Sequence, residues 1–112
     1  MFKKILRKIY RSKDSIYQDE IMSIVKNNKN VVLLDVRSKQ EYDEGHLKGA
    51  INIPVYELQN RAENELKNKQ CLLIAYCSAG IRSRKALEIL RKLGYQNLYN
   101  VEDGVRIFWK IM

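Results

Sequence analysis

The sequence predicts an α/β fold, a doubly wound and mainly parallel sheet with helices on both of its faces. Short apolar runs rich in Val, Ile and Leu alternate with stretches in which apolar residues recur every three to four positions. The runs are typical of strands buried on both faces, and the periodic stretches of amphipathic helices. Their alternation indicates βαβ units with right-handed crossovers. With 112 residues, the chain has the length of one domain.

The first half of the chain holds two predicted helices and two predicted strands. Residues 19–26 form a helix whose inner face carries Ile21, Met22 and Val25. Residues 31–36 are a continuous apolar run and form a buried strand. Ser38 and Glu41 have the spacing of a capping box, which begins a short helix. Residues 50–53 form the next strand.

The second half repeats this alternation. Pro54 opens a helix whose inward residues are Val55, Leu58, Ala62 and Leu66. Residues 71–76 form a continuous apolar strand, and the helix after it ends at Gly94. The inner face of that helix carries Ala86, Leu87, Leu90 and Leu93. Residues 98–101 form the last strand, and residues 105–112 a final apolar helix.

The charge divides the chain into a basic extension, residues 1–14, and a domain, residues 15–112. The net charge is +8, from 21 basic and 13 acidic residues, and six of the basic residues lie within residues 1–13. The rest is nearly balanced, which disfavours a nucleic-acid surface. The extension has an apolar helical stripe formed by Phe2, Ile5, Leu6 and Ile9. It either makes weak peripheral membrane or partner contacts through residues 1–13 or packs on the domain.

The composition excludes several classes of protein. With 46% hydrophobic and 30% charged residues, the chain is globular rather than disordered. No apolar run is long enough to span a bilayer, and no signal peptide is visible. Two cysteines cannot form a disulfide framework, so a reducing cytoplasm is the expected location. A single histidine and no paired-cysteine motif leave no metal site, and no cofactor is expected.

Cys77 lies at the end of the strand over residues 71–76 and just before a helix. Open α/β sheets carry their sites at the carboxyl ends of strands. Backbone N–H groups of the turn, the helix N-terminus and the charges of Arg82 and Arg84 all favour a thiolate. Gly80 allows unusual backbone angles and a close approach to a bound atom. A lone cysteine is usually an inert core residue, but this combination indicates a nucleophilic sulfur facing an anion.

Four blocks of sequence resemble the rhodanese-like family, and their order and spacing match one rhodanese domain. They are residues 33–37 (LLDVR), 41–42 (EY), 45–54 (GHLKGAINIP) and 77–83 (CSAGIRS). The resemblance implies a sulfurtransferase that takes a sulfane sulfur from a small anionic donor, thiosulfate, or from a persulfide. A thiol, cyanide or an acceptor protein then removes this sulfur.

The resemblance also assigns roles to residues. Cys77 becomes the persulfide carrier, and Arg82 receives the anionic donor. The N–H groups of the loop from Ser78 to Arg82 form the cradle, through Ser78, Ala79, Gly80, Ile81 and Arg82. Ser83 is either a helix cap, the commoner role, or a donor to the persulfide. Asp35 and Arg37 border the site and hold loops in place by hydrogen bonds and an ion pair.

Loop length separates the reactions of this fold. Phosphatases and arsenate reductases place five residues between cysteine and arginine, whereas four separate Cys77 from Arg82. The shorter loop resembles the sulfurtransferase type. The alternative from another class is a non-catalytic persulfide carrier or protein-binding module docked through the basic N-terminal helix.

The other reactive side chains are expected to be structural. Cys71 begins the strand that ends before Cys77, about 20 Å away at the usual strand rise, so it is a core residue and not a resolving thiol. His46 lies in a connecting turn. The family usually carries two glycines where this chain has Asp103 and Gly104, and a tryptophan at Phe108, which Trp109 follows here. Aspartate tolerates a left-handed turn, so the fold should be kept. If its carboxylate points into the site, it should weaken the binding of anionic donors.

Overall fold

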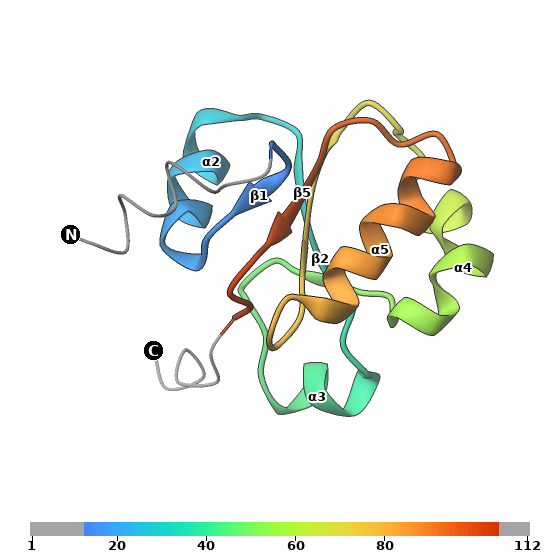
Figure 1. Cartoon of the computed structure of the whole chain (residues 1–112), viewed down its shortest axis with the longest axis horizontal. Helices are drawn as coiled ribbons and strands as arrows, with labels where there is room; N and C mark the ends of the chain where they lie inside the picture. Colours follow the sequence, from blue (N-terminus) through green and yellow to red (C-terminus); the bar gives the residue numbers. More distant parts are fainter. Residues whose placement is uncertain (1–12, 106–112) are drawn as a thin grey trace.

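The fold is built on five parallel strands in the order β1-β5-β4-β2-β3, and it confirms the predicted fold class (Figure 1). The computed structural model describes residues 13–105. The predicted N-terminal stripe and the final helix, with Phe108 and Trp109, therefore lie outside the described residues. The strands are β1 (Ser15–Ile16), β2 (Val31–Asp35), β3 (Ile51–Asn52), β4 (Leu72–Tyr76) and β5 (Leu98–Val101).

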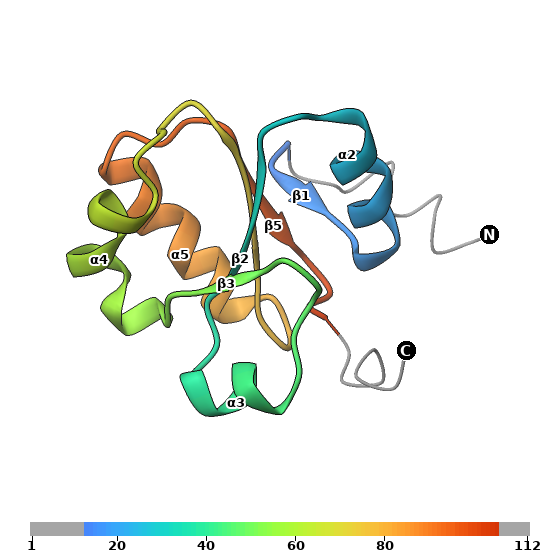
Figure 2. The same cartoon turned by 180° about the vertical axis from the view of Figure 1, so that it is seen from behind.

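Helices cover both faces of the sheet, as the sequence predicts. The helices α4 and α5 lie together on one side, α2 lies on the other, and α3 lies at one end of the strands (Figures 1 and 2). Short 3-10 turns, η1 (Gln18–Glu20) and η2 (Val55–Glu57), lead into α2 and α4. The helices are α2 (Ile21–Asn27), α3 (Lys39–Glu44), α4 (Leu58–Glu65) and α5 (Ile81–Lys92).

The central strand β4 supplies two separate cores because successive side chains on a strand point to opposite faces. Leu73 and Ala75 pack beneath α4 and α5. Ile74 and Tyr76 pack on the opposite face, with Ile21 of α2. A strand buried on both faces must be apolar at every position, which explains the unbroken run that predicts it.

Two details differ from the sequence prediction. Met22, predicted to face inward, is 63% exposed, because α2 is short and buries only Ile21 fully. Strand β1 was not predicted, since two residues carry no detectable periodicity. Its pairing comes from its neighbour: the N–H groups of Asn100 and Glu102 donate to the carbonyls of Asp14 and Ile16, each at 2.8 Å.

Parallel strands bring all carboxyl ends to one edge of the sheet. The loop after β4, the turn after β5 and helix α3 after β2 therefore lie at the same end of the molecule (Figure 1). Polar and reactive residues that are distant in the sequence come together at this end of the sheet. Within residues 13–105, no helix is both long and apolar enough to cross a membrane.

Tyr95 links the turn after α5 to α4 through its buried hydroxyl. The hydroxyl donates to the carbonyls of Leu66 and Ala62, at 2.6 and 3.2 Å. We expect Tyr95→Phe to lower the free energy of unfolding by about 1–2 kcal/mol, because buried carbonyls lose their donor. Urea denaturation measures the change. The exposed Tyr56→Phe is the control and should change little; equal losses in both variants would contradict this account.

Candidate active site

The sulfur of Cys77 lies buried at the end of β4, against the first turn of α5. The side chain is 1% exposed. Its Sγ accepts a hydrogen bond from the N–H of Gly80 at 3.1 Å and another from the N–H of Ser83 at 3.4 Å. The Ser83 hydroxyl oxygen also lies 3.4 Å from Sγ. The sulfur therefore sits inside a ring of donors at a helix N-terminus.

These contacts favour the thiolate. Burial by itself raises the pKa of Cys77, because it penalises the charged form. The hydroxyl and N–H of Ser83, with the backbone of Ala79 and Gly80, act in the opposite direction and outweigh it, so the pKa lies below its ordinary value. A lowered pKa increases the fraction of thiolate, which is the nucleophilic form of cysteine.

Gly80 also makes a close approach to the turn after β5, which the sequence did not predict. It caps α5 in a left-handed conformation, φ 89°, which presents its N–H to the sulfur. A Cβ at this position would overlap the carbonyl oxygen of Glu102. At Gly104, φ 72°, a Cβ would overlap the carbonyl oxygen of Ser78. The loop thus lies directly on the turn after β5, and the N–H of Val105 donates to the Cys77 carbonyl at 2.9 Å.

Ser83 does not cap the helix, so the commoner of its two predicted roles is wrong. Gly80 occupies the N-cap position, and Ser83 lies within the first turn of α5, fully buried. Both its N–H and its hydroxyl face Cys77. Of its two predicted roles, donation to the sulfur is the one that the geometry supports.

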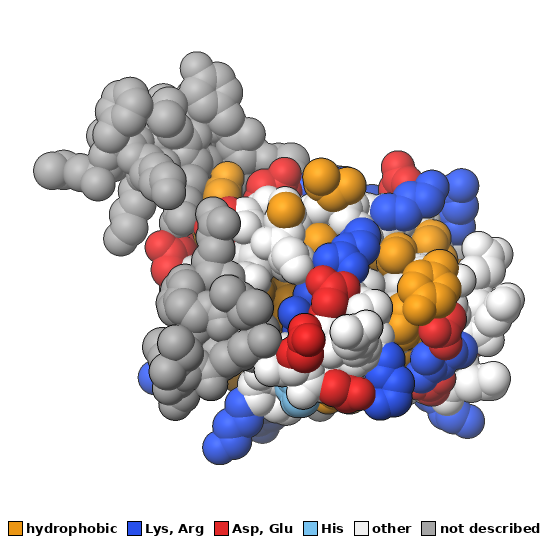
Figure 3. Space-filling model, turned by 90° about the horizontal axis from the view of Figure 1, so that it is seen from below, with side chains coloured by type: hydrophobic (Ala, Val, Ile, Leu, Met, Phe, Trp, Pro, Cys, Tyr) orange, Lys and Arg blue, Asp and Glu red, His pale blue; other side chains and the backbone are white. Residues whose placement is uncertain are grey.

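Arg82 is already paired with a carboxylate. Its guanidinium donates to both oxygens of Glu41 in α3, at 2.6 and 3.0 Å. This pairing holds the pKa of Glu41 down, to about 2, against the opposing effect of burial. The predicted anion receptor is therefore neutralised by its partner. At this end of the molecule acidic and basic side chains lie next to one another (Figure 3).

Two other charges expected near the site are engaged elsewhere. Arg84 pairs with Asp14 and Glu102, beside β1 and β5. Asp103 accepts a hydrogen bond from the N–H of Gln18 at 3.2 Å. It does not adopt a left-handed conformation, because Gly104 supplies the positive φ of that turn.

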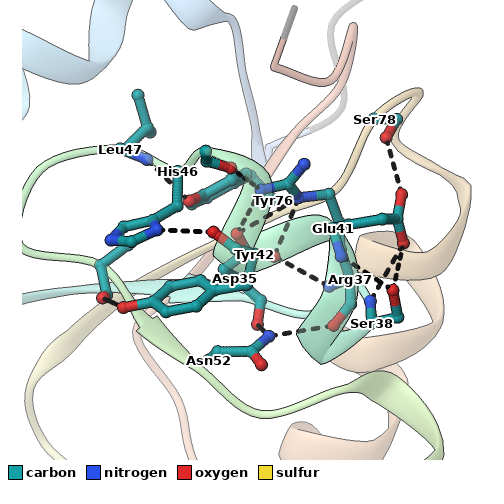
Figure 4. A network of polar contacts seen from close by, with 12 residues as sticks. Asp35, Arg37, Ser38, Glu41, Tyr42, His46, Leu47, Asn52, Tyr76 and Ser78 are labelled. Atoms are coloured by element: carbon teal, nitrogen blue, oxygen red, sulfur yellow. Dashed lines mark hydrogen bonds and ion pairs between the residues drawn. The ribbon is translucent and has the colours of Figure 1, made fainter. Parts of the chain in front are cut away.

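Asp35 and Arg37 form a buried ion pair at the end of β2 (Figure 4). The Arg37 guanidinium donates to both oxygens of Asp35, at 2.8 to 3.2 Å, and to the carbonyl of Gly45 at 2.6 Å. The Asn52 amide donates to the carbonyls of both residues, each at 2.9 Å. The pair thereby joins β2, β3 and the segment after α3, the arrangement expected of residues that hold loops in place.

His46 and Cys71 have surroundings that agree with structural roles. The His46 ring stacks on Tyr42, with centroids 3.6 Å apart, and its Nδ1 lies 2.8 Å from the Tyr42 carbonyl oxygen. Cys71 is buried as a free thiol at the far end of β4, where burial raises its pKa. Among residues 13–105, no group of histidine, cysteine and carboxylate side chains is arranged to hold a metal ion.

Sequence reasoning missed two contributors to the site. Glu41 was recognised as part of a capping box and of the family's motif, and neither of these predicts a partner in α5. Gly104 lies against Ser78 although the two residues are distant in sequence. A resemblance to the family marks both positions as part of a motif, but their contacts emerge only when α3 and the turn after β5 meet the loop.

A comparison with known families decides the class of the chain. The family model of the Rhodanese-like domain matches residues 18–110 of the sequence. The chain belongs to the rhodanese-like domain family. The rhodanese-like fold is seen again in solved structures: human single-domain sulfurtransferase TSTD1 superposes with a TM-score of 0.74 at 26% identity, over 90% of this chain and 99% of that protein.

Relatives of this rhodanese-like chain carry several names. YqhL of Bacillus subtilis is 33% identical over 104 residues, covering 88% of this chain and 81% of YqhL. The thiosulfate sulfurtransferase PspE of Escherichia coli is 39% identical over 67 residues, 60% of this chain and 64% of PspE. A tRNA uridine(34) hydroxylase of Buchnera aphidicola is 36% identical over 70% of this chain, which spans only 26% of that enzyme.

The Ser83 hydroxyl should control the reactivity of Cys77. We expect Ser83→Ala to raise the pKa of Cys77, because the thiolate loses a donor while remaining buried. Alkylation by iodoacetamide at pH 7 should slow several-fold and recover as the pH rises. The rate is measured as a function of pH in a Cys71→Ala background, so that one thiol reports. An unchanged pH profile would show that the backbone donors alone set the pKa.

The Asp35–Arg37 pair should dominate the stability of this end of the domain. Asp35→Asn leaves a buried guanidinium uncompensated, and we expect a loss of about 3–5 kcal/mol in the free energy of unfolding. The matched control, Asp43→Asn, breaks the exposed pair with Lys39 and should lose less than about 1 kcal/mol. Urea denaturation compares the two, and similar losses would contradict the structural role of the buried pair.

Proposed function

We propose that this chain is a sulfurtransferase that moves a sulfane sulfur from thiosulfate or a persulfide donor to a thiophilic acceptor through a persulfide on Cys77. The observation that carries the proposal is the ring of donors from Gly80 and Ser83 around a sulfur whose pKa is lowered. The family supports the same class of reaction, since PspE is named a thiosulfate sulfurtransferase.

The first half-reaction loads the cysteine. The Cys77 thiolate attacks the outer sulfur of thiosulfate, the S–S bond breaks, and its electron pair leaves with sulfite. A persulfide donor reacts in the same way, with a thiolate as the leaving group. In both cases charge and electrons balance, and no external oxidant or reductant is required.

The second half-reaction unloads it. A thiol or cyanide attacks the outer sulfur of the Cys77 persulfide, and the electron pair of the broken bond returns to Cys77 as thiolate. The donors that stabilise the thiolate therefore also favour its departure. The N–H of Gly80 and the hydroxyl of Ser83 serve in this proposal as donors to the sulfur in both states.

The loop geometry favours sulfur transfer over phosphate or arsenate chemistry. An oxyanion enzyme needs its loop donors directed at a tetrahedral group beyond the sulfur. Here Gly80 and Ser83 donate to the sulfur itself, and Arg82 is paired with Glu41. Hydrolysis of an aryl phosphate, lost in Cys77→Ser, would contradict this assignment.

Intact mass tests the proposal. Reduced wild-type protein incubated with thiosulfate, or with cysteine persulfide, should gain one sulfur atom, and cyanide should release it as thiocyanate. Cys77→Ser should gain none, whereas Cys71→Ala should behave as wild type because its thiol lies at the far end of β4. Failure of the wild type to gain sulfur from either donor would refute the proposal and favour a protein-binding module.

A further inference from the structure

Glu41 connects helix α3 to the loop that holds Cys77. Its carboxylate receives both arms of the Arg82 guanidinium, at 2.6 and 3.0 Å, a two-point geometry that is among the stronger polar contacts in proteins. The side chains are 38% exposed for Arg82 and 33% for Glu41, so the pair lies at the protein surface beside the buried sulfur.

The carboxylate is also fixed from its own helix. The N–H and hydroxyl of Ser38 donate to the same Glu41 oxygen, at 3.0 and 3.1 Å, as part of the capping box of α3. The hydroxyl of Ser78, the residue after Cys77, lies 3.5 Å from the other oxygen (Figure 4). Glu41 is thus oriented toward the loop before any ligand arrives.

The pair alters the charge that an incoming donor meets. The pKa of Glu41 is lowered to about 2, first by its hydrogen bonds to Arg82, so the carboxylate is ionised at neutral pH. The pKa of Arg82 is raised, first by its hydrogen bonds to Glu41 and then by its interaction with Cys77, against the opposing effect of burial. A donor therefore approaches the Cys77 sulfur beside an arginine whose positive charge is neutralised by the Glu41 carboxylate.

We propose that Glu41 is a specificity-determining residue that disfavours dianionic thiosulfate and favours organic persulfides as donors to Cys77. This inference rests on the proposed function. To bind the Arg82 guanidinium, thiosulfate must displace the Glu41 carboxylate from it. The two negative charges of thiosulfate then lie beside the negative charge of Glu41. An alkyl persulfide carries at most one charge on its reacting sulfurs, and none when protonated, so Glu41 opposes it far less.

The reaction is the same for either donor. The Cys77 thiolate attacks the outer sulfur of the alkyl persulfide, the S–S bond breaks, and its electron pair leaves on the alkyl thiolate. The difference lies in the charge that must enter the site and leave it, since thiosulfate releases a sulfite dianion. Glu41 therefore acts on the binding of the donor and leaves the chemical step unchanged.

The variant Glu41→Gln separates charge from shape. Glutamine also completes a capping box, so α3 is expected to remain folded, which thermal unfolding verifies. Removing the carboxylate charge should raise kcat/KM for thiosulfate roughly tenfold, mainly through a lower KM, as expected for one charge near a protein surface. The value of kcat/KM for cysteine persulfide should change less than twofold.

Glu44→Gln, which removes the same charge at an exposed position of α3, is the control and should leave both values of kcat/KM unchanged.

A second measurement does not depend on sulfur transfer. Iodoacetate and iodoacetamide alkylate a thiolate by the same displacement of iodide, but only iodoacetate is an anion. In a Cys71→Ala background, the ratio of the iodoacetate rate to the iodoacetamide rate should rise several-fold in Glu41→Gln. The ratio cancels any change in the thiolate fraction of Cys77.

The outcomes distinguish the two proposals. If wild type and Glu41→Gln have the same donor preference, or if Glu44→Gln shifts it equally, the role of Glu41 is overturned while sulfur transfer stands. If no variant gains sulfur from either donor, the proposed function fails and the donor specificity fails with it. The alkylation ratio then shows separately whether Glu41 excludes anions from Cys77.

Discussion

The site depends on a direct contact between two backbone segments, the loop after β4 and the turn after β5. No side chain separates them: a Cβ on Gly80 would overlap the Glu102 carbonyl, and one on Gly104 the Ser78 carbonyl. This contact holds Gly80 in its left-handed conformation, which turns its N–H to the sulfur and begins α5. The helix then places Ser83 against Cys77. The surroundings of Cys77 are therefore organised by packing of the main chain.

Two ion pairs flank α3 and differ in what they can contribute. Asp35–Arg37 is buried and also binds the Gly45 carbonyl, so breaking it destabilises the fold, and the Asn52 amide joins β3 to the backbone of both residues. Glu41–Arg82 is partly exposed, and solvent screening limits its value for stability. Its position beside the sulfur makes it more important for the charge of the site. The short helix α3 thus follows the structural pair at the end of β2 and supplies Glu41 to the pair beside the sulfur.

Much of the fold was predictable because its patterns are local. A strand covered on both faces is apolar along its length, as residues 31–34 and 72–76 are, and the Ser38–Glu41 capping box spans only four residues. Two-residue strand β1 lacked such a pattern, since it exists only through pairing with β5. Met22 was misplaced because apolar spacing does not say how much of a seven-residue helix its neighbours cover.

The class of the fold, the family and the cysteine at the end of a central strand could all be predicted from the sequence, because residues near one another in the chain encode them. The surroundings of that cysteine, in contrast, depend on how distant segments pack. Ser83 faces the sulfur because α5 begins at Gly80, and Arg82 is neutralised because α3, forty-one residues earlier at Glu41, is brought beside it. Contacts between distant segments depend on how the parallel strands align their ends, and no local pattern records that alignment.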